Sequence, residues 1–350
     1  MDKKNIRNLT YKDMQSYCAA KGYPMHRAAQ LYAWVYRKNM SAFSGMTDLP
    51  KEIIETVSKE CALKKLLCEE KKVSRDGTRK FLWKLEDGEY IESVLLKEKN
   101  RRTLCLSTQA GCRFRCPFCA SGKKGFKRNL DVSEIVGQVL EAQEITKEKV
   151  TNIVFMGMGE PLDNYENLEK AIRIINDKNG LGIGARKITV STCGIVPGII
   201  KLKDLGIQVE LSVSLHASNN AMRNELVPAN KKYPLEELLA VCRKHYNATG
   251  RVITLEYAMI KGKNDSAEDA DALVRVAGRL KAKVNLISCN PYTFEPSSPE
   301  KVRKFRDRLR SQGCNVTIRK SCGKDILAAC GQLAAEHRIQ KLEDRGQRED

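Results

Sequence analysis

The 350-residue sequence lacks a long uninterrupted apolar run, a secretion signal and internal repeats. None of its hydrophobic stretches approaches the roughly 20 residues that a helix needs to span a bilayer. Its first residues, MDKKNIRNLTYKD, are too polar for a signal peptide. No low-complexity segment is visible either. We therefore expect a cytoplasmic protein that does not contact a membrane.

Acidic residues are scarce relative to basic ones. The chain has 62 Lys and Arg against 43 Asp and Glu, which leaves a net charge of +19 at pH 7. Such an excess indicates a polyanionic partner, nucleic acid first, although a basic but solvated surface would give the same count. Two blocks concentrate the charge: residues 101–128 contain no acid, and residues 303–320 contain Asp307 alone. The first block surrounds the densest group of cysteines, which favours a functional role.

The 13 cysteines do not indicate a disulfide framework. Cytoplasmic cysteines are normally reduced thiols, metal ligands or catalytic groups, and an odd count agrees with that. Most of them, for example Cys18, Cys61, Cys242 and Cys314, are expected to be small buried hydrophobic residues.

The residues before position 67 have the pattern of helices. The segment HRAAQLYAWVYRK spaces apolar residues at helical intervals, and LPKE at 49–52 begins a further helix with proline near its first turn. At 80–96, two strand-like runs flank an Asp-Gly pair, which indicates a hairpin.

Beyond residue 103, short strands alternate with amphipathic helices. We predict strands at 104–107, 152–156, 187–191, 209–215, 253–258 and 284–288, and helices at 131–147, 165–177, 235–247 and 266–280. This alternation predicts parallel strands with right-handed crossovers. The fold class is therefore α/β, an incomplete (β/α)6 barrel with its active site at the C-terminal ends of the strands. After residue 300 we expect a helix, a strand at 316–319, a last helix and a charged tail. The predicted domains are a helical accessory module for RNA binding at 1–66, a β-hairpin linker at 67–102, the partial barrel at 103–300 and a C-terminal extension at 301–350.

Three cysteines, Cys112, Cys116 and Cys119, have the spacing C-x3-C-x2-C in a loop after a predicted strand. Three thiolates can hold three irons of a [4Fe–4S] cluster and leave the fourth iron open, whereas ferredoxin-type clusters use four cysteines. An open iron can chelate the amino and carboxylate groups of S-adenosylmethionine (SAM). The alternative is zinc, but zinc sites usually pair two C-x2-C knuckles, or one knuckle with histidines, and neither follows here. The spacing therefore favours the cluster.

With this motif the sequence resembles the radical SAM superfamily, whose further motifs appear in order. GMGEP at 157–161 resembles the segment that binds the SAM amino group, although glycine and proline could merely make a turn. Serines commonly end strands, and a lone histidine is more often structural, so each later match is weak by itself. The resemblance implies SAM contacts at Gly159, Glu160, Ser191, Ser214, Leu215, His216 and Asn290.

The resemblance becomes more specific in the segments LCLS at 104–107 and DILAACGQL at 325–333. Together with FMGMGEPL at 155–162 they are similar to the RlmN/Cfr family of adenosine methyltransferases, over nearly the whole chain. The family implies that Cys330 receives a methyl group from one SAM, and that a second SAM, cleaved at the cluster, provides a radical that activates this methyl group. It implies that Cys105 is the resolving thiol, which forms a disulfide with Cys330, and that Glu92 is the proton acceptor.

The chemistry of adenine accounts for the additional cysteines. Carbon-2 is electron-poor and cannot simply attack the SAM methyl group, so a thiolate must carry the methyl first. Without the family resemblance, purely structural roles are the alternatives. Cys105 would be a thiol in the core, Cys330 a packing residue on a helix, and Glu92 a solvated carboxylate. The chain also departs from the family, which usually has Arg-Gly before the Asp-Ile step, where this chain has Ser-Cys-Gly-Lys at 321–324. Cys322 could compete as a thiol.

The family implies 23S ribosomal RNA and tRNA as substrates, and an electron donor such as flavodoxin or ferredoxin; we expect a monomer. The target base must leave its stack to reach a buried site. Methylation at carbon-8, which confers antibiotic resistance, is the alternative within the family. A non-catalytic iron–sulfur RNA-binding protein would leave Cys105 and Cys330 unexplained. A radical SAM enzyme with a small-molecule substrate would leave the basic blocks unexplained.

Overall fold

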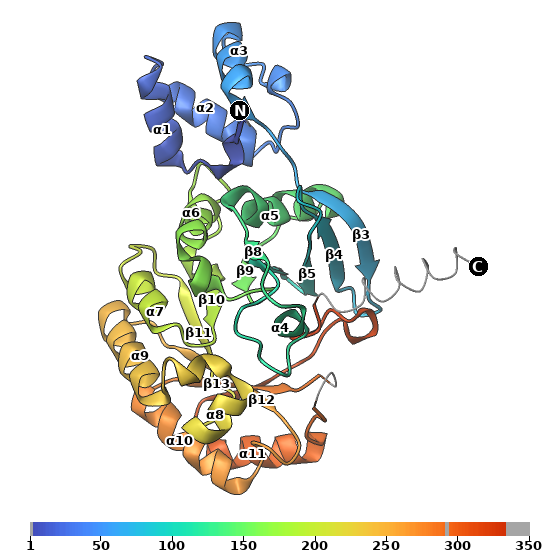
Figure 1. The fold of residues 1–350 in the computed structure, drawn as a ribbon, viewed down its shortest axis with the longest axis vertical. Helices are drawn as coiled ribbons and strands as arrows, with labels where there is room; N and C mark the ends of the chain where they lie inside the picture. The colour runs from blue at the N-terminus through green and yellow to red at the C-terminus, as the bar shows by residue number, and fades with distance from the viewer. Residues whose placement is uncertain (1–2, 291–293, 334–350) are drawn as a thin grey trace, which may run out of the picture.

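A computed structural model of the chain describes residues 3–290 and 294–333. Three layers follow one another along its long axis: an N-terminal helical unit, a large sheet with helices against it, and a group of helices at the opposite end (Figure 1). In the described part of the chain, no helix is both long and apolar enough to cross a membrane.

The N-terminal unit consists of α1 (Tyr11–Ala20), α2 (Met25–Tyr36) and α3 (Lys51–Glu60), and a short parallel pair, β1 (Lys4–Asn5) with β2 (Cys61–Ala62), brings its two ends together. Thr10 and Asp13 form a capping box that begins α1, and prolines precede α2 and α3. A buried ion pair of 2.8 Å between Arg7 and Glu141 joins this unit to the barrel.

One ten-stranded sheet forms the centre of the molecule, in the order β14-β13-β12-β11-β10-β9-β6-β5-β4-β3. From β6 to β14 all neighbouring strands are parallel, and β3, β4, β5 and β6 pair antiparallel. The bounds are β3 Leu67–Val73, β4 Arg79–Lys84, β5 Tyr90–Glu98, β6 Arg101–Cys105, β9 Asn152–Phe155, β10 Ile188–Thr192, β11 Glu210–Ser214, β12 Thr254–Met259, β13 Lys283–Ser288 and β14 Val316–Arg319.

All six strands predicted for the barrel are present, and so is the predicted hairpin, as β4 and β5. The hairpin continues the barrel sheet, because β5 turns tightly into β6 and Lys97 pairs with Arg102. The predicted strand at 316–319 is β14, and it adds a seventh parallel strand at the edge of the sheet.

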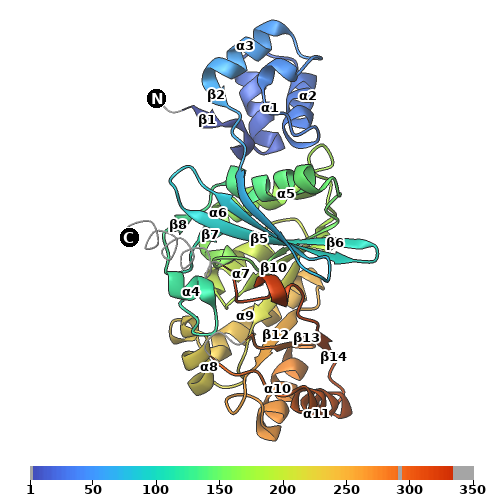
Figure 2. The ribbon, with the colours of Figure 1, turned by 90° about the vertical axis from the view of Figure 1, so that its right-hand side faces the viewer.

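Helices connect the parallel strands and pack outside the sheet (Figures 1 and 2). Capping boxes at Asp131 with Glu134 and at Ser266 with Asp269 begin two of the predicted helices. The helices are α5 Val132–Thr146, α6 Tyr165–Asn176, α7 Val196–Lys203, α8 Asn220–Leu226, α9 Leu235–Thr249, α10 Ala267–Leu280 and α11 Pro299–Ser311.

The last predicted helix is wrong over the residues that the structure describes. After β14 the chain makes one 3-10 turn, Lys324–Ile326, and then irregular turns as far as residue 333. Left-handed backbone conformations at Gly323, Leu327 and Gly331, with φ of 65°, 48° and 81°, prevent a continuous helix. Cys330 therefore lies in a loop. The charged tail expected after it lies outside the described residues.

Candidate active site

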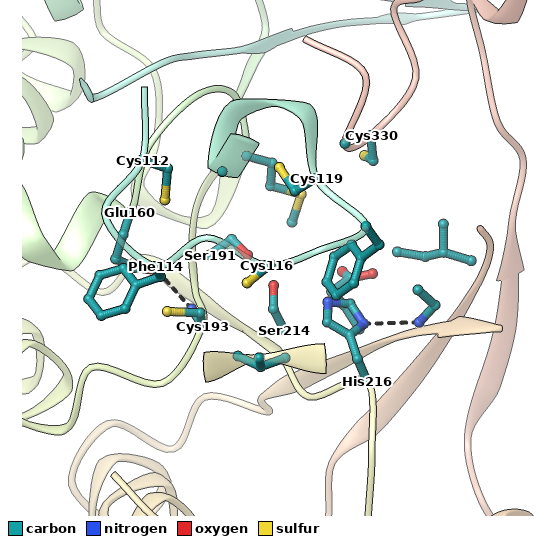
Figure 3. Close-up of a pocket in the computed structure, with 18 of the residues that line it drawn as sticks. Cys112, Phe114, Cys116, Cys119, Glu160, Ser191, Cys193, Ser214, His216 and Cys330 are labelled. Carbon is teal, nitrogen blue, oxygen red and sulfur yellow. Dashed lines mark hydrogen bonds between the residues drawn. The ribbon is translucent and has the colours of Figure 1, made fainter. Parts of the chain in front are cut away.

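The three motif cysteines line one cavity at the C-terminal ends of the parallel strands (Figure 3). They lie in the loop between β7 (Gln109–Ala110) and α4 (Ala120–Lys124). Gly111 begins this loop with φ of 77°, and a Cβ there would lie 1.6 Å from the carbonyl oxygen of Gly125. Only glycine permits this close approach.

The cavity is an unfavourable place for a bare thiolate. Burial raises the pKa of Cys112 to about 12, and negative charge on Cys119 and Glu160 acts in the same direction. Burial also raises the pKa of Cys116 and Cys119. Thiolates at these positions therefore need positive charge from a bound metal centre. Among the described residues no three potential ligands gather closely enough for a single ion, and the three thiols instead face a common space.

The segment after β9 forms another wall of the cavity. Gly159, with φ of 93°, packs so closely on Gln109 that a Cβ would lie 2.5 Å from the Gln109 side chain. Glu160 is buried, and it accepts hydrogen bonds from the backbone N–H groups of Leu162, at 3.0 Å, and Cys193, at 2.8 Å. Burial raises the pKa of Glu160 despite these bonds. A protonated amine bound beside this carboxylate would stabilise its charged form.

The ends of β10 and β11 contribute Ser191, Ser214 and His216 to the same cavity. His216 has a left-handed backbone, with φ of 56°, and its Nδ1 accepts a hydrogen bond of 3.0 Å from the N–H of Ala258. Burial, with the nearby Arg223 charge, lowers the pKa of His216 to about 3. His216 is therefore neutral, with its proton on Nε2. Leu215 is fully buried and does not line the cavity.

Asn290 and Cys330 connect this cavity to the C-terminal extension. Both line the cavity, and the Asn290 Nδ2 donates a hydrogen bond of 2.8 Å to the Cys330 carbonyl oxygen. The next residue, Gly331, accepts a bond of 2.7 Å from the N–H of Ala120 at the start of α4. The loop that carries Cys330 is thus held beside the motif cysteines, as Figure 2 shows for the red segment next to α4.

Cys330 also lines a second, adjoining cavity, together with Cys105 and Cys322. Cys105 is buried at the end of β6, and burial, with the nearby Cys330, raises its pKa to about 12. Among the described residues both Cys105 and Cys330 are free, so the structure does not contain the expected disulfide.

Glu92 lies outside the linings of both cavities. It is buried on β5, on the same face as Val94 and Leu96, which line the second cavity. Its Oε1 lies 3.1 Å from the Nζ of Lys80 on β4. The structure therefore brings every predicted cysteine and SAM residue except Leu215 to the cavities, and leaves Glu92 beneath the C-terminal loop.

Two charged residues were missed by the sequence reading. Arg319, at the end of β14, lines both cavities, and its Nη1 donates to the Met156 sulfur at 3.3 Å. Negative charge on the Cys330 sulfur raises the pKa of Arg319 above its ordinary value. Glu256 on β12 is buried in the wall of the first cavity, and its Oε2 lacks a partner within the described part of the chain. The sequence did offer a signal for Glu256, because a carboxylate within an otherwise apolar strand is costly to bury and therefore indicates a functional role.

The two basic blocks are partly neutralised within the protein. In the first, Arg102 pairs with Glu148, and Arg128 pairs with Asp87 and Glu134. Arg115 and Lys127, near the motif cysteines, remain exposed. In the second block three cations have carboxylate partners: Lys304 with Glu300, Arg306 with Asp307 and Arg308 with Asp271. Part of each basic block is therefore offset by carboxylates, and Arg115 and Lys127 are exposed cations that lie close to the motif cysteines.

The residues of the first cavity fit an iron–sulfur cluster and SAM. Soft thiol ligands select iron–sulfur centres, zinc or copper, and three of them face one space here. Beside them lie the Glu160 carboxylate and the polar side chains that end β10, β11 and β13. These groups suit the amino group, the ribose and the carboxylate of a nucleoside-linked amino acid.

Comparison with known proteins agrees with this geometry. The model of the Radical SAM superfamily matches residues 106–277, and that of the ribosomal RNA large subunit methyltransferase N-terminal domain matches residues 4–63. The crystal structure of a radical SAM methyltransferase from Sphaerobacter thermophilus is similar, with a TM-score of 0.90 and 42% identity over 95% of this chain and 100% of that one. Fold and site together define the class of radical SAM methyltransferases.

Curated relatives narrow this class. A probable dual-specificity RNA methyltransferase RlmN from Clostridium novyi is 43% identical over 94% of this chain and 97% of its own length. The corresponding protein from Thermotoga maritima is 44% identical over 98% of this chain and 99% of its own length. The chain belongs to the RlmN family of radical SAM RNA methyltransferases. The prediction made from the two cysteine segments is confirmed at the level of the family.

Proposed function

We propose that the protein methylates carbon-2 of adenosine in 23S ribosomal RNA and tRNA, with Cys330 as the methyl carrier. The observation that carries the proposal is the position of Cys330, which lines both the cavity of the motif cysteines and the cavity of Cys105. A carrier thiol must reach a methyl donor on one side and a resolving thiol on the other. The relatives are named dual-specificity RNA methyltransferases, which supports both RNA substrates.

Separate groups of residues are proposed to bind the cluster and SAM. Cys112, Cys116 and Cys119 would ligate a [4Fe–4S] cluster, and Glu160 would bind the SAM amino group. Ser191, Ser214, His216 and Asn290 are the proposed further SAM contacts, and Gly159 contributes backbone. Leu215, whose N–H donates to the Glu256 carbonyl oxygen, supports this wall from behind. When bound, the cluster and SAM supply the radical chemistry, and the protein supplies binding and orientation.

The reacting residues are proposed to act in sequence. Cys330 carries the methyl group as a thioether, and the radical that bound SAM and cluster would supply removes one hydrogen atom from it, so that the carbon can bond to carbon-2 and link protein and RNA. Glu92 accepts the carbon-2 proton, and the remaining electron would return to the cluster. The Cys105 thiolate then attacks the Cys330 sulfur, which forms the disulfide and breaks the sulfur–carbon bond, and the released carbon takes a proton to become the methyl group. The place of Cys105 supports this role, because it lines the second cavity together with Cys330.

The exposed cations around the cavity are proposed to bind the RNA backbone. Arg115 and Lys127 are exposed beside the cysteine loop, and Arg113 lies 4.0 Å over the ring of Phe126. Contacts between such cations and RNA phosphates hold the RNA without recognising its sequence. We further propose two SAM molecules per turnover, an electron donor such as flavodoxin or ferredoxin, a monomeric state and a cytoplasmic location.

The test is anaerobic incubation of reconstituted protein with reductant, SAM and rRNA or tRNA, followed by mass spectrometry of the digested RNA. The expected product is 2-methyladenosine, formed by the wild type and absent with Cys330→Ala. The matched control is Cys314→Ala, a partly buried cysteine that lines neither cavity. Formation of 8-methyladenosine would overturn the carbon-2 assignment and keep the carrier mechanism.

A further inference from the structure

A buried lysine, Lys80 on β4, connects the proposed base to the loop of the methyl carrier. Its Nζ lies 3.1 Å from Glu92 Oε1, and both side chains are only 6% exposed. The same Nζ donates a hydrogen bond of 3.3 Å to the carbonyl oxygen of Leu327, three residues before Cys330. An ammonium group has three donors, so one lysine can hold both partners at once.

Strand register places this pair under the carrier loop. Lys80 pairs with Val94 across β4 and β5, and Val94 pairs with Cys105 across β5 and β6. Glu92 precedes Val94 by two residues and points to the same face of the sheet. Lys80, Glu92 and Cys105 therefore share one face, and the C-terminal loop covers it, because that loop and Val94 line the same cavity.

The Leu327 carbonyl is presented to Lys80 by an unusual backbone. Leu327 has φ of 48°, a conformation that is uncommon for a non-glycine residue and persists only where the surroundings hold it. The Lys80 bond is one such restraint. A second is the bond from the Ala328 N–H to Gly323 at 2.9 Å. Hydrogen bonds therefore restrain the loop both at Leu327 and at the residue after it.

We propose that Lys80 is a positioning residue that holds Glu92 in its reactive orientation and fixes the Cys330 loop above Cys105. The inference rests on the proposed roles of Glu92 and Cys330. Burying two charges costs solvation free energy, and their mutual attraction often offsets only part of this cost. Stability alone is therefore a poor explanation for the pair. Lys80 contacts no cofactor or substrate in this scheme and acts through the carboxylate and the loop.

The test compares Lys80→Met with Lys80→Arg and the matched control Lys84→Met. Lys84 lies on the same strand and the same face but is exposed. Three quantities are measured: 2-methyladenosine formed, protein–RNA adduct that survives a denaturing gel, and methyl group on Cys330 by mass spectrometry of the protein. Glu92→Gln is the reference variant for a stalled release step.

For Lys80→Met we expect a decrease in turnover of about 10- to 100-fold, as for loss of hydrogen bonds to a charged group. Adduct should accumulate as in Glu92→Gln, and Lys80→Arg should restore part of the turnover because it keeps the charge. Lys84→Met should resemble the wild type. Wild-type turnover without adduct in Lys80→Met would overturn the proposal.

A double variant keeps the test decisive if Lys80→Met does not fold, because Lys80→Met with Glu92→Gln removes both buried charges. The double variant should methylate Cys330 more slowly than Glu92→Gln alone, since only the double variant lacks the Leu327 anchor. Equal rates would overturn the loop-fixing role. Absence of adduct in Glu92→Gln itself, with full methylation, would instead overturn the proposed base, whatever Lys80 does.

Discussion

The Asn290 side-chain amide donates a hydrogen bond of 2.8 Å to the carbonyl oxygen of Cys330. This bond joins the end of the barrel strand β13 to the loop of the carrier cysteine, 40 residues further along the chain. Asn290 also lines the cofactor cavity. A residue proposed to bind SAM thus also holds the thiol that receives the methyl group.

Replacement of Asn290 by leucine tests this double role. We expect weaker SAM binding and slower methylation of Cys330, each by roughly 5- to 10-fold, because a hydrogen bond contributes about 1 kcal/mol. SAM affinity is measured by titration of the reconstituted protein, and methylation by mass spectrometry of the protein. Asn247→Leu, on the exposed face of α9, is the control. Loss of SAM affinity without slower methylation would contradict the positioning role.

Replacement of Cys105 by alanine should separate attachment of the RNA from its release. Cys105 lines the second cavity with Cys330 but does not line the first. Methylation of Cys330 should therefore continue, whereas a covalent protein–RNA adduct should accumulate. A denaturing gel with labelled RNA detects it.

Cys322 is the internal control for the Cys105 experiment, since it lines the same cavity. Cys322→Ser should release RNA as the wild type does. Adduct with Cys322→Ser and none with Cys105→Ala would reverse the assignment of the resolving thiol.

His216 should make the protein less stable at low pH. Its folded pKa, about 3, lies below the ordinary value of 6.5, so the unfolded chain binds a proton first as the pH falls. The stabilisation is complete above pH 6.5 and is lost as the pH falls toward 3. Between pH 7 and pH 5 the loss from this residue is about 2 kcal/mol.

The variant His216→Asn should weaken this pH dependence, because asparagine does not titrate and its oxygen can accept the Ala258 N–H. Urea unfolding at pH 7 and pH 5 measures the difference. His26→Asn, an exposed histidine on α2, is the control. An unchanged pH dependence in His216→Asn would contradict the buried neutral imidazole.

The exposed cations beside the cysteine loop should set the salt dependence of RNA binding. Arg115→Ala with Lys127→Ala should weaken binding to all RNA sequences alike and reduce the slope of log K against log salt by about 0.7–0.9 per charge removed. Filter binding at several salt concentrations measures this slope. Lys201→Ala on α7, where the lysine pairs with Glu166 at 2.9 Å, should leave it unchanged. An unchanged slope in the double variant would place the RNA elsewhere.

The barrel and the position of its cavity could be predicted from the sequence because they depend on local patterns. Each predicted strand is a short apolar run, and each SAM residue lies at the C-terminal end of one or a few residues beyond it. Parallel strands present their C-terminal ends at one edge, so side chains such as Ser191, Ser214 and Asn290 meet without further information. Cys112, Cys116 and Cys119 lie within eight residues of one another, and one loop suffices to bring them together.

The C-terminal loop could not be predicted in the same way. The segment DILAACGQL has helix-forming residues, but contacts with distant parts of the chain determine its shape. Asp325 accepts a bond from the Arg75 N–H at 3.1 Å, and Lys80 holds Leu327. These partners are some 250 residues away in sequence, and tertiary contacts override local propensity. The pairing of Glu92 with Lys80 could not be predicted either, because it depends on the register between β4 and β5.

The most direct test of the account follows the methyl group through Cys330. The protein is incubated anaerobically with SAM labelled in its methyl group and with reductant, before RNA is added, and both protein and digested RNA are then analysed by mass spectrometry. We predict label on Cys330 before RNA is added, and label in 2-methyladenosine afterwards, with neither product in Cys330→Ala. Labelled 2-methyladenosine formed by Cys330→Ala would contradict the carrier role, and with it the central claim.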